Sequence, residues 1–228
     1  MKCLMELILI GIDIFIFKYI GFYPGIIFLV VISYIFLKKL GFLRKPGIFR
    51  GNFPEGVVFL KDYQGPFYKA NTAFKEASNL IKTFQLKDYA IIAFYYDRPG
   101  EVEESKLRYS VGIYKKNKGF PDKPSGDLEN HCKTNNYYYA ELPNSSSLYS
   151  FWEYSNAFTL MLGIKKFYTI LNNSLNDNDF RRTFKIQDKN FKIKVGVEVY
   201  ESGSKMEFFI PLMNTEKFLL YKKDTKTE

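Results

Sequence analysis

Residues that bind metals or form disulfides are scarce in this 228-residue chain. It contains two cysteines, Cys3 and Cys132, and one histidine, His131. Two cysteines cannot build a disulfide framework, so a reducing compartment is the simpler expectation. One His–Cys pair also falls short of the four ligands of a structural zinc site. The sequence has no Gly-rich phosphate loop, no Cys-x-x-Cys pair and no catalytic triad. We therefore expect no cofactor and assign no catalytic residue.

Acidic residues are missing between positions 38 and 50, where five basic residues lie: Lys38, Lys39, Arg44, Lys45 and Arg50. The formal net charge of +9 is therefore uneven, and the rest of the chain is closer to balance. A nucleic-acid-binding face needs basic residues spread along a docking surface. A basic patch confined to one end argues against a nucleic-acid partner.

Charge of either sign is absent from Tyr19–Leu37. This run is long enough to cross the hydrocarbon core of a bilayer, and it ends at Lys38 and Lys39 without a signal-peptide cleavage site. We predict a transmembrane helix here, within a membrane anchor at residues 1–39. Because the basic flank of a span stays on the cytosolic side, the rest of the chain should face the cytosol.

The stretch Leu4–Phe17 is also apolar but contains Glu6 and Asp13. Charged residues are costly inside the bilayer, which disfavours an independent second span. Two arrangements remain open. The stretch extends the same helix, or the break at residues 21–25 turns the chain into a re-entrant hairpin. Both leave the larger part of the chain in the cytosol.

Two later segments share the order strand, helix, strand, strand, judged from alternating and helical spacing of apolar residues. The first unit contains Val57–Tyr63, Phe67–Phe84, Ala90–Tyr96 and Leu107–Lys115. The second contains Ser147–Tyr154, Phe158–Leu171, Lys192–Glu201 and Lys205–Leu212. We predict an α+β domain at residues 56–214, with two half-sheets side by side and one helix per half on the same side. A basic linker at residues 40–55 precedes it, a polar tail at residues 215–228 follows, and Asn117–Asn135 forms a loop before a short strand at Tyr137–Leu142.

Three motifs in this order give the segment a recognisable character: YQGPF at Tyr63–Phe67, YYDRPGEVEESKLRYSVGI at Tyr95–Ile113, and VEVYESGSKMEFFIPL at Val197–Leu212. Together they resemble the GyrI-like effector-binding fold, which also covers SOUL-type relatives. With a membrane helix in front, the layout resembles the testis-expressed family of single-pass endoplasmic reticulum membrane proteins.

The second resemblance implies a cytosolic domain on the endoplasmic reticulum (ER) that acts as an adaptor or receptor in ER-phagy (reticulophagy). It also implies two partners, a ubiquitin-like autophagy modifier and an AAA ATPase. Members of that family bind the modifier through an aromatic-x-x-aliphatic motif in a long acidic tail. The last residues given, Phe218–Glu228, are short and basic, so we do not expect them to serve as that tail. Phe209–Leu212 fits the motif but falls in the predicted last strand.

The GyrI-like resemblance implies a ligand-binding cleft with a glutamate on the penultimate strand, suited to small amphipathic or cationic molecules. Here the matching residue is Glu198, and strand alternation puts Tyr200 on the same face. Trp152, Tyr149 and Tyr96 are the further aromatic candidates. A solvated Glu198 near Lys192 or Lys194 is the alternative to a ligand site. A membrane-tethered small-molecule binder or detoxifying hydrolase is therefore the alternative to the receptor function.

Overall fold

The computed structural model describes residues 22–116, 126–186, 191–201 and 204–222. The chain divides into two units, Met1–Lys45 and Pro46–Glu228. In the first unit, helix α2 (Phe22–Lys39) ends in two lysines and exposes apolar side chains along its length. No helix within the described ranges combines the length and the apolar character needed to cross a bilayer. The predicted span begins at Tyr19, outside the described residues, and Leu4–Phe17 lies wholly outside them.

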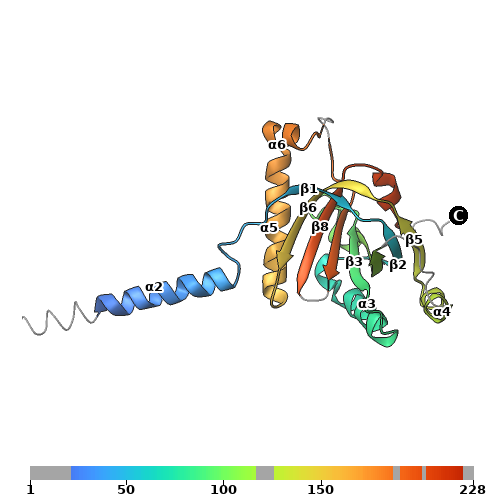
Figure 1. Ribbon diagram of the computed structural model, residues 1–228, viewed down its shortest axis with the longest axis horizontal. Coiled ribbons are helices and arrows are strands. Elements are labelled where there is room, and N and C mark those ends of the chain that lie inside the picture. Colours follow the sequence, from blue (N-terminus) through green and yellow to red (C-terminus); the bar gives the residue numbers. More distant parts are fainter. Residues whose placement is uncertain (1–21, 117–125, 187–190, 202–203, 223–228) are drawn as a thin grey trace, which may run out of the picture. The chain divides into compact units, whose positions relative to one another are not determined.

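The second unit is built on an eight-stranded sheet with the order β1-β6-β8-β7-β3-β4-β2-β5 (Figure 1). Every pairing in it is antiparallel. The strands are β1 (Phe49–Phe53), β2 (Gly56–Gln64), β3 (Tyr89–Tyr95), β4 (Arg108–Lys116), β5 (Tyr138–Leu142), β6 (Ser145–Glu153), β7 (Gly196–Glu201) and β8 (Lys205–Pro211). The helices are α3 (Asn71–Thr83), α4 (Gly126–Thr134), α5 (Ala157–Leu175) and α6 (Asn178–Thr183), with short 3-10 turns η1 (Phe67–Lys69), η2 (Glu104–Lys106) and η3 (Thr215–Phe218).

The sheet order confirms the predicted duplication. The units β2-α3-β3-β4 and β6-α5-β7-β8 contribute three strands each, and these meet where β3 pairs with β7. Reading outward from this central pair gives β4 and β2 on one side and β8 and β6 on the other. Ala93 and Glu198 lie directly opposite each other across the centre.

Both long helices cover the same face of the sheet, as predicted. α3 packs through Ala77 and Leu80 in a core that includes Ala93 and Val111. α5 packs through Phe167 and Leu171 in a second core with Trp152 and Phe208. Phe208 lies opposite Glu198, and Glu198 lies opposite Ala93, so these side chains share one face. Glu198 therefore sits between the two helix-covered halves.

The opposite face carries the third core, which includes Val197, Val199 and Phe53. Phe53 on edge strand β1 contacts Tyr114 on β4, with ring centroids 5.6 Å apart. Four strands lie between β1 and β4 in the sheet order. The sheet therefore curls around this third core.

Three local expectations differ from the structure. Strand β1 forms inside the segment predicted as a linker, because it pairs with β6 and buries Phe53. Part of the predicted loop Asn117–Asn135 is helix α4, which buries Leu128 and Cys132 at helical spacing, while residues 117–125 lie outside the described ranges. The predicted polar tail begins with η3, whose Phe218 is fully buried.

Candidate functional site

Glu198 is a buried carboxyl group in the middle of the sheet, 1% exposed. It lies on β7 and faces the helices, whereas Val197 and Val199 face the opposite core. Lys192 and Lys194 are exposed. A solvated Glu198 beside those lysines is therefore wrong, since its side chain has almost no contact with water.

Three tyrosines surround this carboxyl group. The hydroxyl of Tyr200, two residues along β7, donates to Glu198 Oε2 at 2.5 Å. Tyr168 from α5 and Tyr95 from the end of β3 also direct their hydroxyls to Glu198 and lower its pKa. We call Glu198, Tyr95, Tyr168 and Tyr200 the central cluster.

Packing of the neighbouring residues explains how α5 brings Tyr168 to the sheet. The preceding residue, Phe167, stacks on Phe208 with ring centroids 4.1 Å apart, and Phe208 lies opposite Glu198. On β7, a Cβ at Gly196 would lie 2.7 Å from the Tyr168 hydroxyl oxygen. Glycine at position 196 therefore leaves room for the tyrosine to approach.

Burial raises the pKa of Glu198 to about 7, and the hydroxyls of Tyr200, Tyr168 and Tyr95 oppose this rise. Burial, followed by the negative charge of Glu198, raises the pKa of each tyrosine well above its ordinary value. The tyrosines therefore stay protonated and act as donors, while the carboxyl group titrates near neutral pH.

Within the described ranges, no lysine, arginine or histidine forms an ion pair with Glu198. The surroundings are aromatic instead. Phe74 of α3 meets Tyr200 edge-on, with ring centroids 4.9 Å apart, and Phe67 of η1 meets Tyr95 in the same way at 4.9 Å. Both halves of the domain therefore contribute rings around a single negative group.

Of the aromatic residues predicted from the sequence, Tyr200 alone belongs to the central cluster. Trp152 is buried under α5, and its Nε1 donates to the carbonyl oxygen of Thr159 at 2.8 Å. It therefore anchors the first turn of that helix. Tyr149 and Tyr96 lie on the opposite face, where Tyr149 donates to Glu207 at 2.9 Å and the Tyr96 hydroxyl is 3.1 Å from Ser110 Oγ.

The sequence prediction missed Tyr95 and Tyr168. Tyr95 is adjacent to the predicted Tyr96, so the strand was identified but the facing residue was one position off. Tyr168 belongs to the predicted helical stretch, but only the packing of α5 on the sheet shows which tyrosine points at Glu198.

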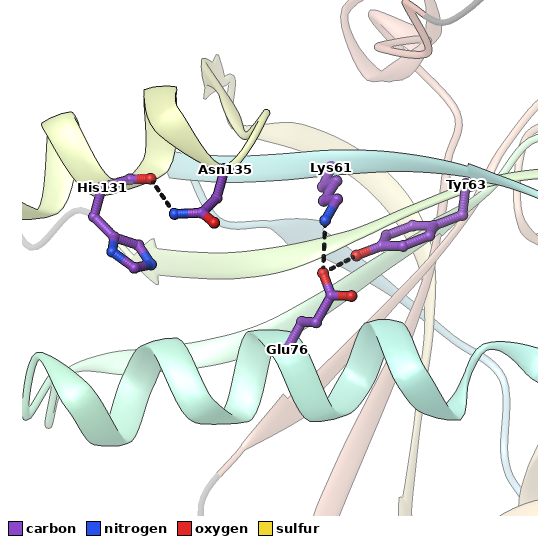
Figure 2. Close-up of polar contacts among 5 residues, drawn as sticks. All are labelled: Lys61, Tyr63, Glu76, His131 and Asn135. Carbon is purple, nitrogen blue, oxygen red and sulfur yellow. Dashed lines mark hydrogen bonds and ion pairs between the residues drawn. The ribbon is translucent and has the colours of Figure 1, made fainter.

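A second polar group on the helix-covered face also combines a carboxylate with tyrosines, but it is more exposed than Glu198 and contains a cation (Figure 2). Lys61 Nζ on β2 lies 2.8 Å from Glu76 Oε2 on α3, and the Tyr63 hydroxyl donates to the same oxygen at 2.9 Å. The ammonium group also lies 5.7 Å and 5.8 Å from the ring centres of Tyr63 and Tyr137, within the range of cation–π attraction. Here a carboxylate and tyrosines hold a lysine of the chain itself.

The histidine near this group takes no part in it. Figure 2 shows the backbone carbonyl of His131 accepting from Asn135 Nδ2, at 2.9 Å. The His131 ring instead meets Phe84 edge-on, with centroids 5.2 Å apart. In the part of the chain that the structure describes, no group of three or more metal-binding side chains gathers.

Comparison with known proteins finds solved structures that are similar to this chain at low sequence identity and low TM-score. The C-terminal domain of EcmrR matches with a TM-score of 0.44 and 12% identity, over 73% of this chain and 96% of that chain. SAV2435 bound to tetraphenylphosphonium matches with a TM-score of 0.45 and 11% identity, over 75% and 96%. A hydrolase from Listeria innocua matches with a TM-score of 0.42 and 13% identity, over 74% and 91%. No protein-family model and no curated protein matches the chain.

Proposed function

We propose that the domain binds a small amphipathic cation, with Glu198 as its counter-ion. The observation that carries this proposal is a buried carboxyl group which three tyrosines surround and which no described cation of the chain neutralises. Burying an ionised carboxylate without a partner is costly. A cationic ligand would supply the missing charge.

The surroundings of Glu198 support the amphipathic character of this ligand. Three tyrosine rings lie around the carboxyl group, and Phe67 and Phe74 pack against two of these tyrosines. The faces of aromatic rings attract cations as well as apolar groups. Sites of this kind combine apolar walls with a few polar groups that fix orientation. A strongly hydrated ion such as Na⁺ would gain little from aromatic walls.

Titration of tetraphenylphosphonium into the full chain in detergent tests the proposal, because this cation is apolar and permanently charged. We expect saturable binding that Glu198→Gln weakens at least tenfold. Glu207→Gln is the matched control, since Glu207 is also largely buried but lies on β8 against the opposite core. Equal affinity in wild type and Glu198→Gln would remove Glu198 from the site.

The pKa of about 7 favours a second candidate function, hydrolysis of reactive electrophiles. A general base works best when its pKa lies near the working pH. Glu198 would then activate a water molecule. Turnover of an activated ester by the wild type, abolished in Glu198→Gln and retained in Glu207→Gln, would support hydrolysis. Turnover equal to that in buffer would reject it for this substrate class.

We also propose that the N-terminal unit tethers the domain to a membrane. Apolar side chains exposed along α2, and Lys38 and Lys39 at its end, support this proposal. The span remains the predicted Tyr19–Leu37, and the basic residues that follow it favour a cytosolic domain. ER location is what the family resemblance implies. Asn144-Ser145-Ser146 and Asn172-Asn173-Ser174 are glycosylation sequons. Glycan on either would place the domain in the lumen and contradict the proposed side.

An adaptor or receptor role in ER-phagy stays a prediction from the same resemblance. Phe209 and Ile210 of the candidate docking motif are buried in β8, between β6 and β7. This segment cannot add to a partner's sheet while its own sheet is intact. Binding of the autophagy modifier or the AAA ATPase would therefore need another surface, and a pull-down with the full chain tests it.

A further inference from the structure

The last described residues of the chain lie on the sheet face opposite the helices. After β8, η3 buries Phe218 against Phe53, with ring centroids 5.3 Å apart. Leu220 then packs on the third core, and Lys222 reaches β2. The segment 219–222 is not a strand of the sheet. It can therefore leave the surface without breaking a strand pairing.

Asp62 on β2 is oriented to receive this segment. Its Oδ1 accepts from Ser110 Oγ at 2.6 Å and from the Tyr138 hydroxyl at 2.8 Å. These donors come from the neighbouring strands β4 and β5, so they fix the carboxylate independently of the segment. Its Oδ2 accepts the backbone N–H of Lys222 at 2.7 Å. Hydrogen bonds to an ionised acceptor are among the stronger ones.

Three successive side chains of the segment find separate contacts. Leu220 packs against the third core. The Tyr221 ring meets Tyr96 edge-on at 5.7 Å, and the Arg108 guanidinium lies 5.7 Å from the centre of the Tyr221 ring. Lys222 Nζ lies 4.6 Å from the centre of the Tyr138 ring.

The receiving groups are themselves held in place. Asp97 accepts from Arg108 Nε at 3.0 Å and from Arg108 Nη2 at 2.9 Å, which fixes the guanidinium over the segment. The Tyr96 hydroxyl lies near Ser110 Oγ, in the same hydrogen-bonded group as Asp62 and Tyr138. The surface thus presents a carboxylate that accepts a hydrogen bond from a backbone N–H. It also presents fixed side chains that contact one aromatic and one cationic side chain of the segment.

We infer that Asp62, Tyr96, Arg108 and Tyr138 form a peptide-binding site for extended aliphatic–tyrosine–lysine segments, which Leu220–Lys222 fills within the same chain. This site lies on the other face from Glu198 and is independent of the proposed ligand. The partner that fits it is a basic peptide with a tyrosine before a lysine. Acidic peptides are disfavoured, because a carboxylate at the position of Lys222 would lie near the carboxylate of Asp62.

A chain that ends at Phe218 tests this inference, because it keeps the buried phenylalanine and vacates the site. A fluorescent peptide with the sequence of residues 219–228 should bind this variant saturably. Asp62→Asn should weaken binding at least tenfold, since an amide that keeps its oxygen towards Ser110 and Tyr138 turns its N–H₂ towards the peptide N–H. Glu207→Gln, on β8 of the same face, should leave the affinity unchanged. A folded truncated chain that binds no peptide, or that binds equally with Asp62→Asn, overturns the inference.

Hydrogen exchange of the full chain provides a second measurement if the truncated chain does not fold. The amide of Lys222 should exchange by local opening, faster than the amides that pair β2 with β4, and Asp62→Asn should accelerate it selectively. Exchange of Lys222 only together with the β2–β4 amides would contradict a separable segment.

Discussion

Glu198 places an ionisable group between two apolar neighbours, Ala93 on β3 and Phe208 on β8. An apolar side chain would satisfy this position without desolvating a charge. Three tyrosine hydroxyls reduce the cost of burial but do not neutralise the carboxylate, so its pKa stays near 7. The residue therefore changes charge in the physiological range, and its protonation should affect both stability and the proposed cation binding.

The raised pKa gives a pH dependence of stability. In the folded protein the pKa of Glu198 is about 7, whereas the ordinary pKa of a glutamate side chain is 4.5. The folded state thus binds more protons between these values, and the free energy of unfolding falls as pH rises through this window. The loss is on the order of 3 kcal/mol when complete. Urea unfolding at pH 5 and pH 8 should show this loss in wild type and not in Glu198→Gln; parallel losses in both would refute it.

Cation binding should have the opposite pH dependence, because the bound form needs the carboxylate. Between pH 5.5 and pH 8 the dissociation constant for tetraphenylphosphonium should fall roughly 30-fold for a group titrating near 7. Calorimetry in buffers of different ionisation enthalpy should show about one proton released per cation bound below pH 6. A pH-independent affinity without proton release would mean that Glu198 is already ionised in the empty protein.

The GyrI-like resemblance singled out Glu198 as a candidate, whereas its neighbours were only partly predictable from the sequence. Strand alternation predicts that Tyr200 shares its face. Whether Tyr95 or Tyr96 joins them depends on the register between β3 and β7, and a shift of one residue exchanges the two faces. No local pattern fixes that register across two strands from different halves of the chain.

At the scale of elements, the contact between α5 and β7 positions the central cluster. Gly196 admits the Tyr168 hydroxyl, and Gly163 of α5 admits the ring of Trp152, which would lie 2.4 Å from an added Cβ. The two glycines serve different contacts of the same helix. One borders the cluster and the other borders the core.

Alanine at these two glycines should therefore have different effects. Gly196→Ala displaces the end of a tyrosine side chain, so its unfolding free energy should change by under about 1 kcal/mol. Tetraphenylphosphonium affinity should nevertheless change, since Tyr168 leaves Glu198. Gly163→Ala meets a buried ring and should cost about 1–3 kcal/mol while leaving the affinity of the folded fraction intact. Chemical unfolding and titration of both variants check this; the reverse pattern would show that Tyr168 is not part of the site.

The predictable elements are those whose periodicity is strong. The alternating residues Tyr109, Val111 and Ile113 lie in β4, and Leu107 lies just before its first residue. β1 and α4 were missed because their own sequences are rich in polar residues and glycine. β1 is a strand through its pairing with β6, and α4 buries only Leu128 and Cys132. Tertiary contacts decide such segments more than their propensities do.

At the scale of the whole molecule, the division at Lys45 and Pro46 separates the apolar N-terminal unit from the domain that carries both proposed sites. Three cores of the domain lie within residues 46–228. Removing residues 1–45 should therefore leave the tetraphenylphosphonium affinity unchanged and release the protein from membranes. Sedimentation with liposomes and the same titration check both outcomes. Membrane pelleting of the shortened chain would place the lipid contact in the domain instead.

The central claim is that Glu198 is the counter-ion of a bound cation. Carbon-13 NMR of the full chain with labelled glutamate tests it most directly, with the Glu198 carboxyl signal assigned by its loss in Glu198→Gln. We predict a titration midpoint near 7 in the free protein and a midpoint lower by at least one pH unit with saturating tetraphenylphosphonium. A midpoint that stays the same with and without the cation would contradict the claim.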